Sequence, residues 1–178
     1  MKLLSREAIL GAFEALDQRL GAEGRGERAE LVVAGGAAIV LLYGSREATR
    51  DVDAISLGSG DSGILRESAQ VIAQERGLPE DWLNDGFKGY LNGLLPGEVV
   101  FEGRALRVRS LAPAQLLAMK LSAWRDDVDI ADARLLLVEM EGMRDEVWKA
   151  IEPFVVPGRE LKARYAFDDL WESKDGPT

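Results

Sequence analysis

Residues 33–53 read Val33-Ala-Gly-Gly-Ala-Ala-Ile-Val-Leu-Leu-Tyr-Gly-Ser-Arg-Glu-Ala-Thr-Arg-Asp-Val-Asp53. The apolar residues at its start predict a strand over about 29–34, and the apolar run after the glycine pair predicts a short helix that ends near Tyr43-Gly44. A turn then leads into a second strand over about 52–57. This stretch therefore predicts a strand, a helix and a second strand, with two glycines where the helix begins.

Asp51 and Asp53 stand at the start of the second predicted strand. Residues i and i+2 of a strand point to the same face, so the two carboxylates are aimed together while Val52 turns into the core. Two converging acids repel one another unless a cation lies between them, and hard oxygen ligands favour Mg²⁺ or Mn²⁺. The alternative is an exposed strand start in which both acids are hydrated and Arg50 neutralises one. Because Asp is unfavourable in strands, we favour the metal site.

Gly35 and Gly36 lie where the first strand is expected to meet the helix. Free backbone amides and the helix dipole can hold a phosphate there, and a glycine has no Cβ to block the approach. Taken alone, the pair is better explained as a tight turn into a packed helix. With Asp51 and Asp53 downstream, it favours a phosphate site, to which Ser45 or Arg46 would add side-chain contacts.

The composition excludes several kinds of chemistry. The chain of 178 residues has no cysteine, which excludes disulfides and thiolate catalysis, and no histidine, the commonest general base and zinc ligand. Its formal charge of −9 argues against non-specific binding to a nucleic acid but leaves room for a nucleotide or a local basic groove. The chain shows neither a signal peptide nor an apolar run of about 18 residues, so we expect a cytoplasmic protein with no membrane partner.

The remaining patterns predict an α+β fold. Ser5 is placed to cap a first helix, and Asp61 or Ser62 to cap another that runs through Gln74. Residues 98–108 predict a hairpin, whereas residues 78–97 give no firm prediction. From Pro113 onward the periodicity predicts four helices, over about 114–124, 128–140, 144–154 and 159–171. We therefore expect a small mixed sheet with packed helices over 1–110 and a helical region over 111–178, together forming one structural unit.

Lys120 is unusual for its position on the first of these late helices. Its neighbours at helical spacing are apolar: Leu116, Leu117 and Trp124. A Lys on a buried stripe either extends along it to water or meets an anion. Asp129 and Asp132 on the next helix would supply that anion, and an ion pair between the helices explains all three residues equally well. Arg125 would bind a phosphate or cap the helix end.

The stretch from Gly35-Gly36 through Arg46 to Asp51-Val52-Asp53 resembles the signature of the nucleotidyltransferase superfamily, which has the DNA polymerase β-like fold. The resemblance implies that the glycine pair and the two acids hold a nucleoside triphosphate together with metal ions. The fold expected here is therefore a small nucleotidyltransferase core with a helical C-terminal region.

A closer resemblance is to a branch of small bacterial proteins related to the AbiEii and MenT toxins. In that branch a later helix carries a Lys, and the following segment carries an Arg and an Asp. Residues 117–132 stand in that place here, with Lys120, Arg125 and Asp129.

The chain departs from the superfamily pattern at one position. Many members have a third metal-binding carboxylate on a later strand, but the equivalent strand here reads Leu106-Arg107-Val108-Arg109. Glu98 and Glu102 on the preceding strand are substitutes at best. The toxin-like branch also tends to lack this acid. The pattern leaves open whether a bound nucleotide is turned over.

The resemblance implies Mg²⁺-dependent or Mn²⁺-dependent transfer of a nucleotidyl group from a nucleoside triphosphate to an acceptor hydroxyl on an RNA or tRNA end or on a protein. The implied site residues divide by role: Asp51 and Asp53 for the metal ion; Gly35, Gly36, Ser45, Arg46 and Arg125 for the nucleotide; Lys120 for charge in the transition state; and Asp129 for orienting Lys120 or accepting a proton. A toxin would also have an antitoxin partner. The alternative is a catalytically inactive nucleotide-binding or protein-interaction module with the same fold.

Overall fold

The computed structural model describes residues 3–23, 27–58 and 62–174, which form two compact units. Unit 1 comprises Met1–Lys88 and Pro96–Leu111, and unit 2 comprises Gly89–Leu95 and Ala112–Thr178. The strands of the described chain all lie in unit 1, and its last four α-helices lie in unit 2. The predicted α+β fold with a small mixed sheet is therefore confirmed.

Unit 1 is built on a sheet that has five strands in the described part of the chain. They run in the order β5 (Leu83–Asn84), β4 (Val52–Ser56), β2 (Ala29–Val33), β7 (Leu106–Leu111) and β6 (Pro96–Glu102). β2 pairs antiparallel with β4 and parallel with β7, while β6 and β7 form the predicted hairpin. Leu31, Val32 and Val33 are all buried, as expected for a central strand covered on both faces.

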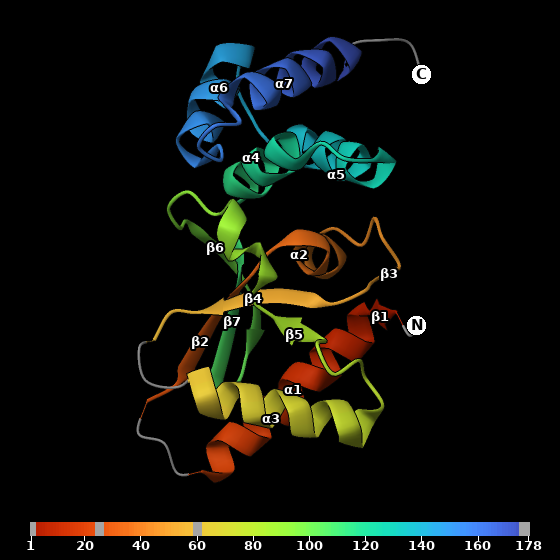
Figure 1. Cartoon of the computed structure of the whole chain (residues 1–178), viewed down its shortest axis with the longest axis vertical. Coiled ribbons are helices and arrows are strands. Elements are labelled where there is room, and N and C mark those ends of the chain that lie inside the picture. The colour runs from red at the N-terminus through yellow and green to blue at the C-terminus, as the bar shows by residue number, and fades with distance from the viewer. Residues whose placement is uncertain (1–2, 24–26, 59–61, 175–178) are drawn as a thin grey trace. The chain divides into compact units, whose positions relative to one another are not determined.

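Helices pack on both sides of this sheet. α1 (Arg6–Ala22) begins at its predicted cap, where the Ser5 Oγ accepts a hydrogen bond of 3.2 Å from the Ala8 amide. In Figure 1, α1 and α3 (Ser62–Arg76) lie together on one side of β4, and α2 (Gly35–Leu42) lies on the other. Phe13 on α1 packs its ring against Trp82 and Phe101, with centroids 6.4 and 5.9 Å apart. These rings help to fill the core between the helices and the sheet.

A second sheet of two short strands includes the segment that follows the turn after α2. The sequence did not predict this sheet. β1 (Leu4–Ser5) pairs antiparallel with β3 (Ala48–Thr49). Two residues are too few to produce a hydrophobic period. The pairing fixes the segment after Arg46 against the residues that lead into α1.

Residues 78–97, which gave no firm prediction, contain β5, the 3-10 helix η1 (Gly86–Tyr90) and the start of β6. β5 extends the sheet beside β4, with Val52 opposite Leu83 and Asp53 opposite Asn84. Short elements of this kind carry no periodic signal. The predicted caps of α3, Asp61 and the Ser62 side chain, lie outside the described part of the chain.

Unit 2 contains the four predicted helices. α4 (Pro113–Ala123) packs against α5 (Asp127–Val138), α6 (Arg144–Ile151) and α7 (Glu160–Lys174), and the 3-10 helix η2 (Glu152–Phe154) follows α6. Pro113 is the first residue of α4, as predicted. The rings of Trp148, Phe167 and Trp171 are in contact between α6 and α7. No helix in the described ranges is both long enough and apolar enough to cross a bilayer.

Asp17 on α1 connects that helix to the β6–β7 hairpin through hydrogen bonds. Its Oδ1 accepts hydrogen bonds from the backbone amides of Ala105 and Leu106, at 2.7 and 2.8 Å. Gly103 in the turn of the hairpin approaches so closely that a Cβ there would overlap the Asp17 carboxylate. A glycine is therefore required for the carboxylate to reach both amides.

We expect Gly103→Ala to lower the free energy of unfolding by about 1–3 kcal/mol, because displacing Asp17 leaves two amides without their acceptor. Gly63 in α3 is the control, since a Cβ there meets no atom within 4 Å. Gly63→Ala should raise the free energy of unfolding by up to about 1 kcal/mol, because Ala is the better helix former. Denaturant unfolding measures both changes, and a Gly103→Ala chain as stable as the parent would contradict this role of Asp17.

Candidate functional site

Asp51 and Asp53 lie at the start of β4. Asp53 is the second residue of the strand, and Asp51 directly precedes it. Val52 is fully buried, whereas the two acids on either side of it are half-buried. This alternation agrees with two acids on the same side of the backbone. The Asp53 carbonyl accepts a hydrogen bond of 2.9 Å from the Ala34 amide, so β4 begins beside the residue that precedes α2.

Gly35 brings the first turn of α2 against the Asp53 carboxylate. Its φ of +59° lies in the left-handed region, which residues with a side chain rarely adopt. A Cβ on Gly35 would lie 3.0 Å from Asp53 Oδ2, which is closer than ordinary van der Waals contact. Both the backbone conformation and the close approach therefore require glycine at this position.

Gly36 is enclosed by two polar side chains. A Cβ on it would lie 2.5 Å from Thr49 Oγ1 and 3.0 Å from a guanidinium nitrogen of Arg46. Thr49 is buried in β3, and Arg46 is half-buried in the turn before it. The structure thus places a hydroxyl and a cation beside the second glycine, as it places a carboxylate beside the first.

The start of α2 is suited to an anion. Its N-cap residue is Ala34, which provides no side-chain acceptor for the first amides of the helix. Amides at a helix N-terminus, together with the positive end of the helix dipole, attract phosphates. The Arg46 guanidinium adds a full positive charge at the same place. These groups can bind a phosphate directly beside the Asp53 carboxylate.

The other predicted residues are divided between the two units. Ser45 lies in the exposed turn after α2, in the same unit as the glycine pair. Lys120, Arg125 and Asp129 belong to unit 2, where they contact one another. Unit 1 therefore brings together the glycines, Arg46 and Asp53, and unit 2 brings together the Lys, Arg and Asp.

The acids of unit 1 fit a magnesium ion that arrives with a nucleotide. Mg²⁺ takes oxygen ligands and is usually held by one or two carboxylates together with substrate phosphates and waters. Among the described residues, no group of three or more His, Cys, Asp or Glu side chains is arranged to hold a metal ion. Asp51 and Asp53 would therefore supply only part of a ligand set, and phosphates bound at the start of α2 would have to complete it.

Glu102 does not replace the third carboxylate of the superfamily. It accepts two hydrogen bonds from the Arg107 guanidinium and another from Arg28, and together these lower its pKa to about 2. The strand register places Glu102 level with Arg107 and Glu30. Ala34, which bonds to Asp53, is four positions along from Glu30. At about 3.3 Å per residue, Glu30 and Ala34 are separated by about 13 Å along the strand direction. Glu102 therefore lies toward the opposite end of the sheet from Asp53.

Lys120 on α4 lies between two buried carboxylates of α5. Its Nζ is 2.9 Å from Asp129 Oδ1 and 2.7 Å from Asp132 Oδ2. The Lys120 side chain is only 12% exposed, and each of the two acids is 3% exposed. The ion pair between helices that the sequence allowed is therefore formed, with Asp132 as an equal partner of Asp129.

Arg125 contacts Asp129 from the opposite side. Trp124 directly follows α4, and its left-handed φ of 39° costs about 1 kcal/mol in a residue with a side chain. The Nε of Arg125 then lies 3.0 Å from Asp129 Oδ2. Burial raises the pKa of Asp129, but the hydrogen bonds from Arg125 and Lys120 outweigh it and lower the pKa overall. Asp129 is thus a weak proton acceptor, which favours the orienting role over that of a base.

Three residues near Asp53 or Gly36 had no predicted role. Asn84 pairs with Asp53 across β4 and β5, and a Cβ on Gly86 would lie 3.8 Å from Asp53 Oδ1. Both come from the part of the chain without a periodic pattern, where the local signal is a turn-forming Asn-Asp-Gly sequence. Thr49 belonged to the recognised motif, but its contact with Gly36 depends on the unpredicted pairing of β3.

A family model described as "Nucleotidyltransferase of unknown function (DUF6036)" matches residues 11–147. The match covers more than half of the 178 residues and includes both the stretch 33–53 and the segment 117–132. The chain therefore belongs to this family, and the predicted nucleotidyltransferase superfamily is confirmed. No curated protein and no solved structure matches the chain.

We expect Lys120→Met to lower the free energy of unfolding by about 3 kcal/mol or more, because it removes the ammonium from two buried carboxylates. The matched control is Lys149→Met on α6, where the lysine is exposed. That change should stay within about 0.5 kcal/mol. Denaturant unfolding compares the two variants, and equal effects would show that the buried ion pairs contribute nothing to stability.

Proposed function

We propose that this chain transfers a nucleotidyl group from a nucleoside triphosphate to an acceptor hydroxyl in a Mg²⁺-dependent reaction. Its membership of a nucleotidyltransferase family supports the general reaction. The observation that carries the finer proposal is the approach of Gly35 and Gly36 to the Asp53 carboxylate and the Arg46 guanidinium. A phosphate site and a metal-binding acid are neighbours there, as a metal-bound triphosphate requires.

In the proposed reaction, the amides of Gly35 and Gly36 and the guanidinium of Arg46 bind phosphate oxygens. Asp51 and Asp53 would hold the Mg²⁺, which when bound would neutralise negative charge on the triphosphate. The acceptor oxygen forms a bond to the α-phosphorus while the bond from that phosphorus to the bridging oxygen breaks, and pyrophosphate leaves. We assign the hydroxyl proton to solvent, because the chain has no histidine and Asp129 is held by two cations.

The proposal includes the relationship to the AbiEii and MenT toxins. It is supported within unit 2 by the contacts that join Lys120, Arg125 and Asp129, the residue types that the resemblance puts in this segment. Lys120 would stabilise charge in the transition state, with Asp129 orienting it. The acceptor would be an RNA or tRNA end or a protein hydroxyl, and a toxin of this kind would be neutralised by an antitoxin.

We expect Mg²⁺ to bind only together with a nucleotide. Titration calorimetry with Mg²⁺ alone should show no binding up to about 1 mM, because two carboxylates leave most of the coordination shell to water. With Mg²⁺ in excess, at least one of the common ribonucleoside triphosphates should bind, and Asp53→Asn should weaken that binding at least about tenfold. A tight Mg²⁺ site in the chain without a nucleotide would contradict this set of ligands.

The transfer reaction itself is tested with triphosphates labelled on the α-phosphate, incubated with Mg²⁺ and total RNA or total protein. We expect the label to enter the acceptor, and Asp53→Asn to reduce its rate at least about a hundredfold. The same triphosphates labelled on the γ-phosphate should transfer nothing, because that phosphate leaves in pyrophosphate. Asp169→Asn is the matched control, since Asp169 is exposed on α7.

The outcomes separate the possible functions. Equal labelling by the parent chain and Asp53→Asn would overturn the enzymatic proposal. Mg²⁺-dependent binding of a triphosphate without any transfer would favour the inactive nucleotide-binding module. A toxin role would be supported if expression of the parent chain, but not of Asp53→Asn, arrested bacterial growth.

A further inference from the structure

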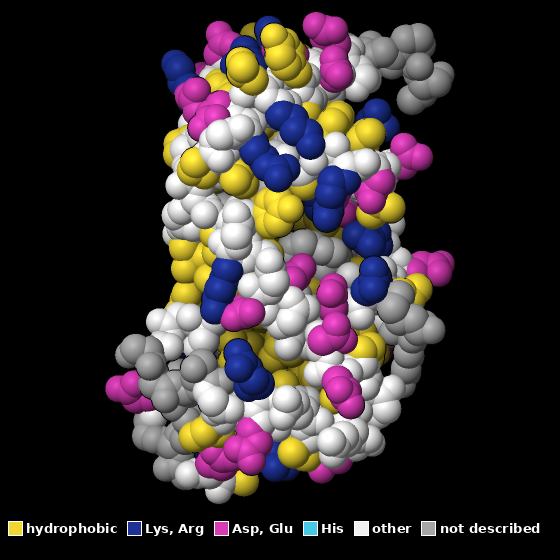
Figure 2. Space-filling model, viewed as in Figure 1, with side chains coloured by type: hydrophobic (Ala, Val, Ile, Leu, Met, Phe, Trp, Pro, Cys, Tyr) yellow, Lys and Arg dark blue, Asp and Glu magenta, His cyan; other side chains and the backbone are white. Residues whose placement is uncertain are grey.

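Unit 1 has a pocket of about 490 Å³ between α3, β4 and the segment that contains β5 and η1. This volume is within the roughly 300–1,000 Å³ that is typical of small-molecule sites. In Figure 2 the same region is hollowed, with hydrophobic side chains in its floor and basic side chains at its edge. The described residues that line the pocket do not include Asp51 or Asp53.

The pocket is lined by α3, which packs on the opposite side of β4 from α2 and its phosphate site. Ala54 lines the pocket, and successive residues of a strand point to opposite faces. Asp53 is accordingly directed to the other face, where it approaches Gly35 at the start of α2. The pocket lining also includes Ile55 and Asn84, which lie on the same side of the sheet as Asp53, but it does not include Asp53 itself.

The floor of the pocket is apolar. The side chains that form it come from β2, β4, α3 and β5: Leu31, Ala54, Leu65, Ala69 and Leu83. Leu65 and Leu83 are only half-buried, so they retain surface that a ligand can cover. Such a floor favours a ligand with an apolar or aromatic body.

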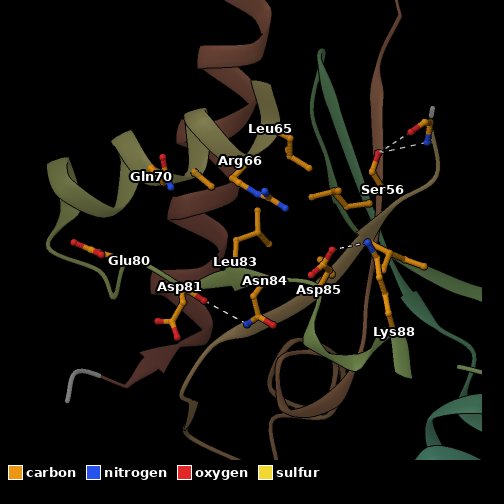
Figure 3. Close-up of a pocket in the computed structure, with 15 residues that line it drawn as sticks. Ser56, Leu65, Arg66, Gln70, Glu80, Asp81, Leu83, Asn84, Asp85 and Lys88 are labelled. Carbon is orange, nitrogen blue, oxygen red and sulfur yellow. Dashed lines mark hydrogen bonds and ion pairs between the residues drawn. The ribbon is translucent and has the colours of Figure 1, made fainter. Parts of the chain in front are cut away.

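One end of the pocket carries more positive than negative charge. Figure 3 shows Arg66 extending from α3 toward Asp85 and Lys88. Asp85 forms an ion pair with Lys88, and this hydrogen bond, with a smaller contribution from Arg66, lowers the pKa of Asp85. Within the described residues the Arg66 guanidinium makes no hydrogen bond or ion pair. Since Lys88 already neutralises Asp85, the charge of Arg66 is available to a ligand.

The remaining acids lie at the other end. Figure 3 shows Glu80 and Asp81 beyond Leu83, on the side away from Lys88, with the Glu80 side chain pointing outward. Both are exposed to solvent, which screens their repulsion of a distant anion. The cationic end and the apolar floor are therefore adjacent, and the acidic end is apart from them.

We propose that this pocket binds a small organic anion, whose charged group pairs with Arg66 and whose apolar body covers Leu65 and Leu83. The planar guanidinium can donate two parallel hydrogen bonds to a carboxylate, sulfonate or phosphate. The apolar floor supplies the second part of the recognition. This site is separate from the proposed triphosphate site and does not depend on it.

The probe for this proposal is anilinonaphthalene sulfonate, a fluorescent aromatic anion, titrated into the full-length chain. We expect one bound probe per chain, and Arg66→Gln should weaken binding at least about tenfold. Arg104→Gln is the matched control, because Arg104 is exposed in the hairpin turn of the same unit and does not line the pocket. Asp53→Asn should bind the probe like the parent chain, which separates this site from the triphosphate site.

An uncharged probe and NMR shifts test the charge dependence and the location of binding. Uncharged phenylnaphthylamine should bind more weakly than the sulfonate and should not distinguish Arg66→Gln from the parent chain. The backbone amide NMR signals of Leu83 and Asn84 should shift on addition of the sulfonate. Circular dichroism checks that both arginine variants are folded. Equal effects of Arg66→Gln and Arg104→Gln, no binding up to about 1 mM, or shifts confined to unit 2 would overturn the proposal.

Discussion

The position of β4 between two strands is the constraint on which the arrangement of unit 1 depends. The Ala34 amide donates to the Asp53 carbonyl at 2.9 Å, and the Val52 amide donates to the Trp82 carbonyl at 2.6 Å. These bonds fix the start of β4 on both sides, so the first turn of α2 must pass directly beside Asp53. Backbone packing alone therefore explains Gly35. Packing does not require charged groups at that point, so Asp53 and Arg46 are the residues there that support the proposed function.

Unit 2 contains a different constraint, which is the burial of charge. Removing carboxylates such as Asp129 and Asp132 from water is unfavourable unless cations and hydrogen bonds replace the lost hydration. Lys120 and Arg125 provide that replacement, and the left-handed Trp124 allows the chain to turn so that Arg125 reaches Asp129. Such a network specifies one geometry of the two helices. A structural role and a catalytic role for Lys120 are compatible, so stability and activity must be measured separately.

The long periodic segments could be predicted from the sequence, because a helix of ten or more residues repeats its pattern several times. The same holds for the i and i+2 spacing of Asp51 and Asp53, which needs only that β4 is a strand. β3 and β5 could not be predicted, since two residues contain no period and their pairing depends on distant parts of the chain. The contacts of Thr49 with Gly36 and of Asn84 with Asp53 follow from those pairings. The residues of the local motif could thus be predicted from the sequence. The residues that distant strands place beside them could not.

The arginines of β7 (Leu106–Leu111) have a consequence for the proposed metal site. Arg107 and Arg109 occupy the strand where the superfamily often has that acid, and both are engaged within the hairpin, Arg107 with Glu102 and Arg109 with the Gly97 carbonyl. An arginine at this position cannot ligate a cation. In the proposed site, two carboxylates would leave most of the ligands of a metal ion to the nucleotide and water. The affinities for metal and nucleotide would then be coupled, and by linkage each ligand would strengthen the binding of the other by the same factor.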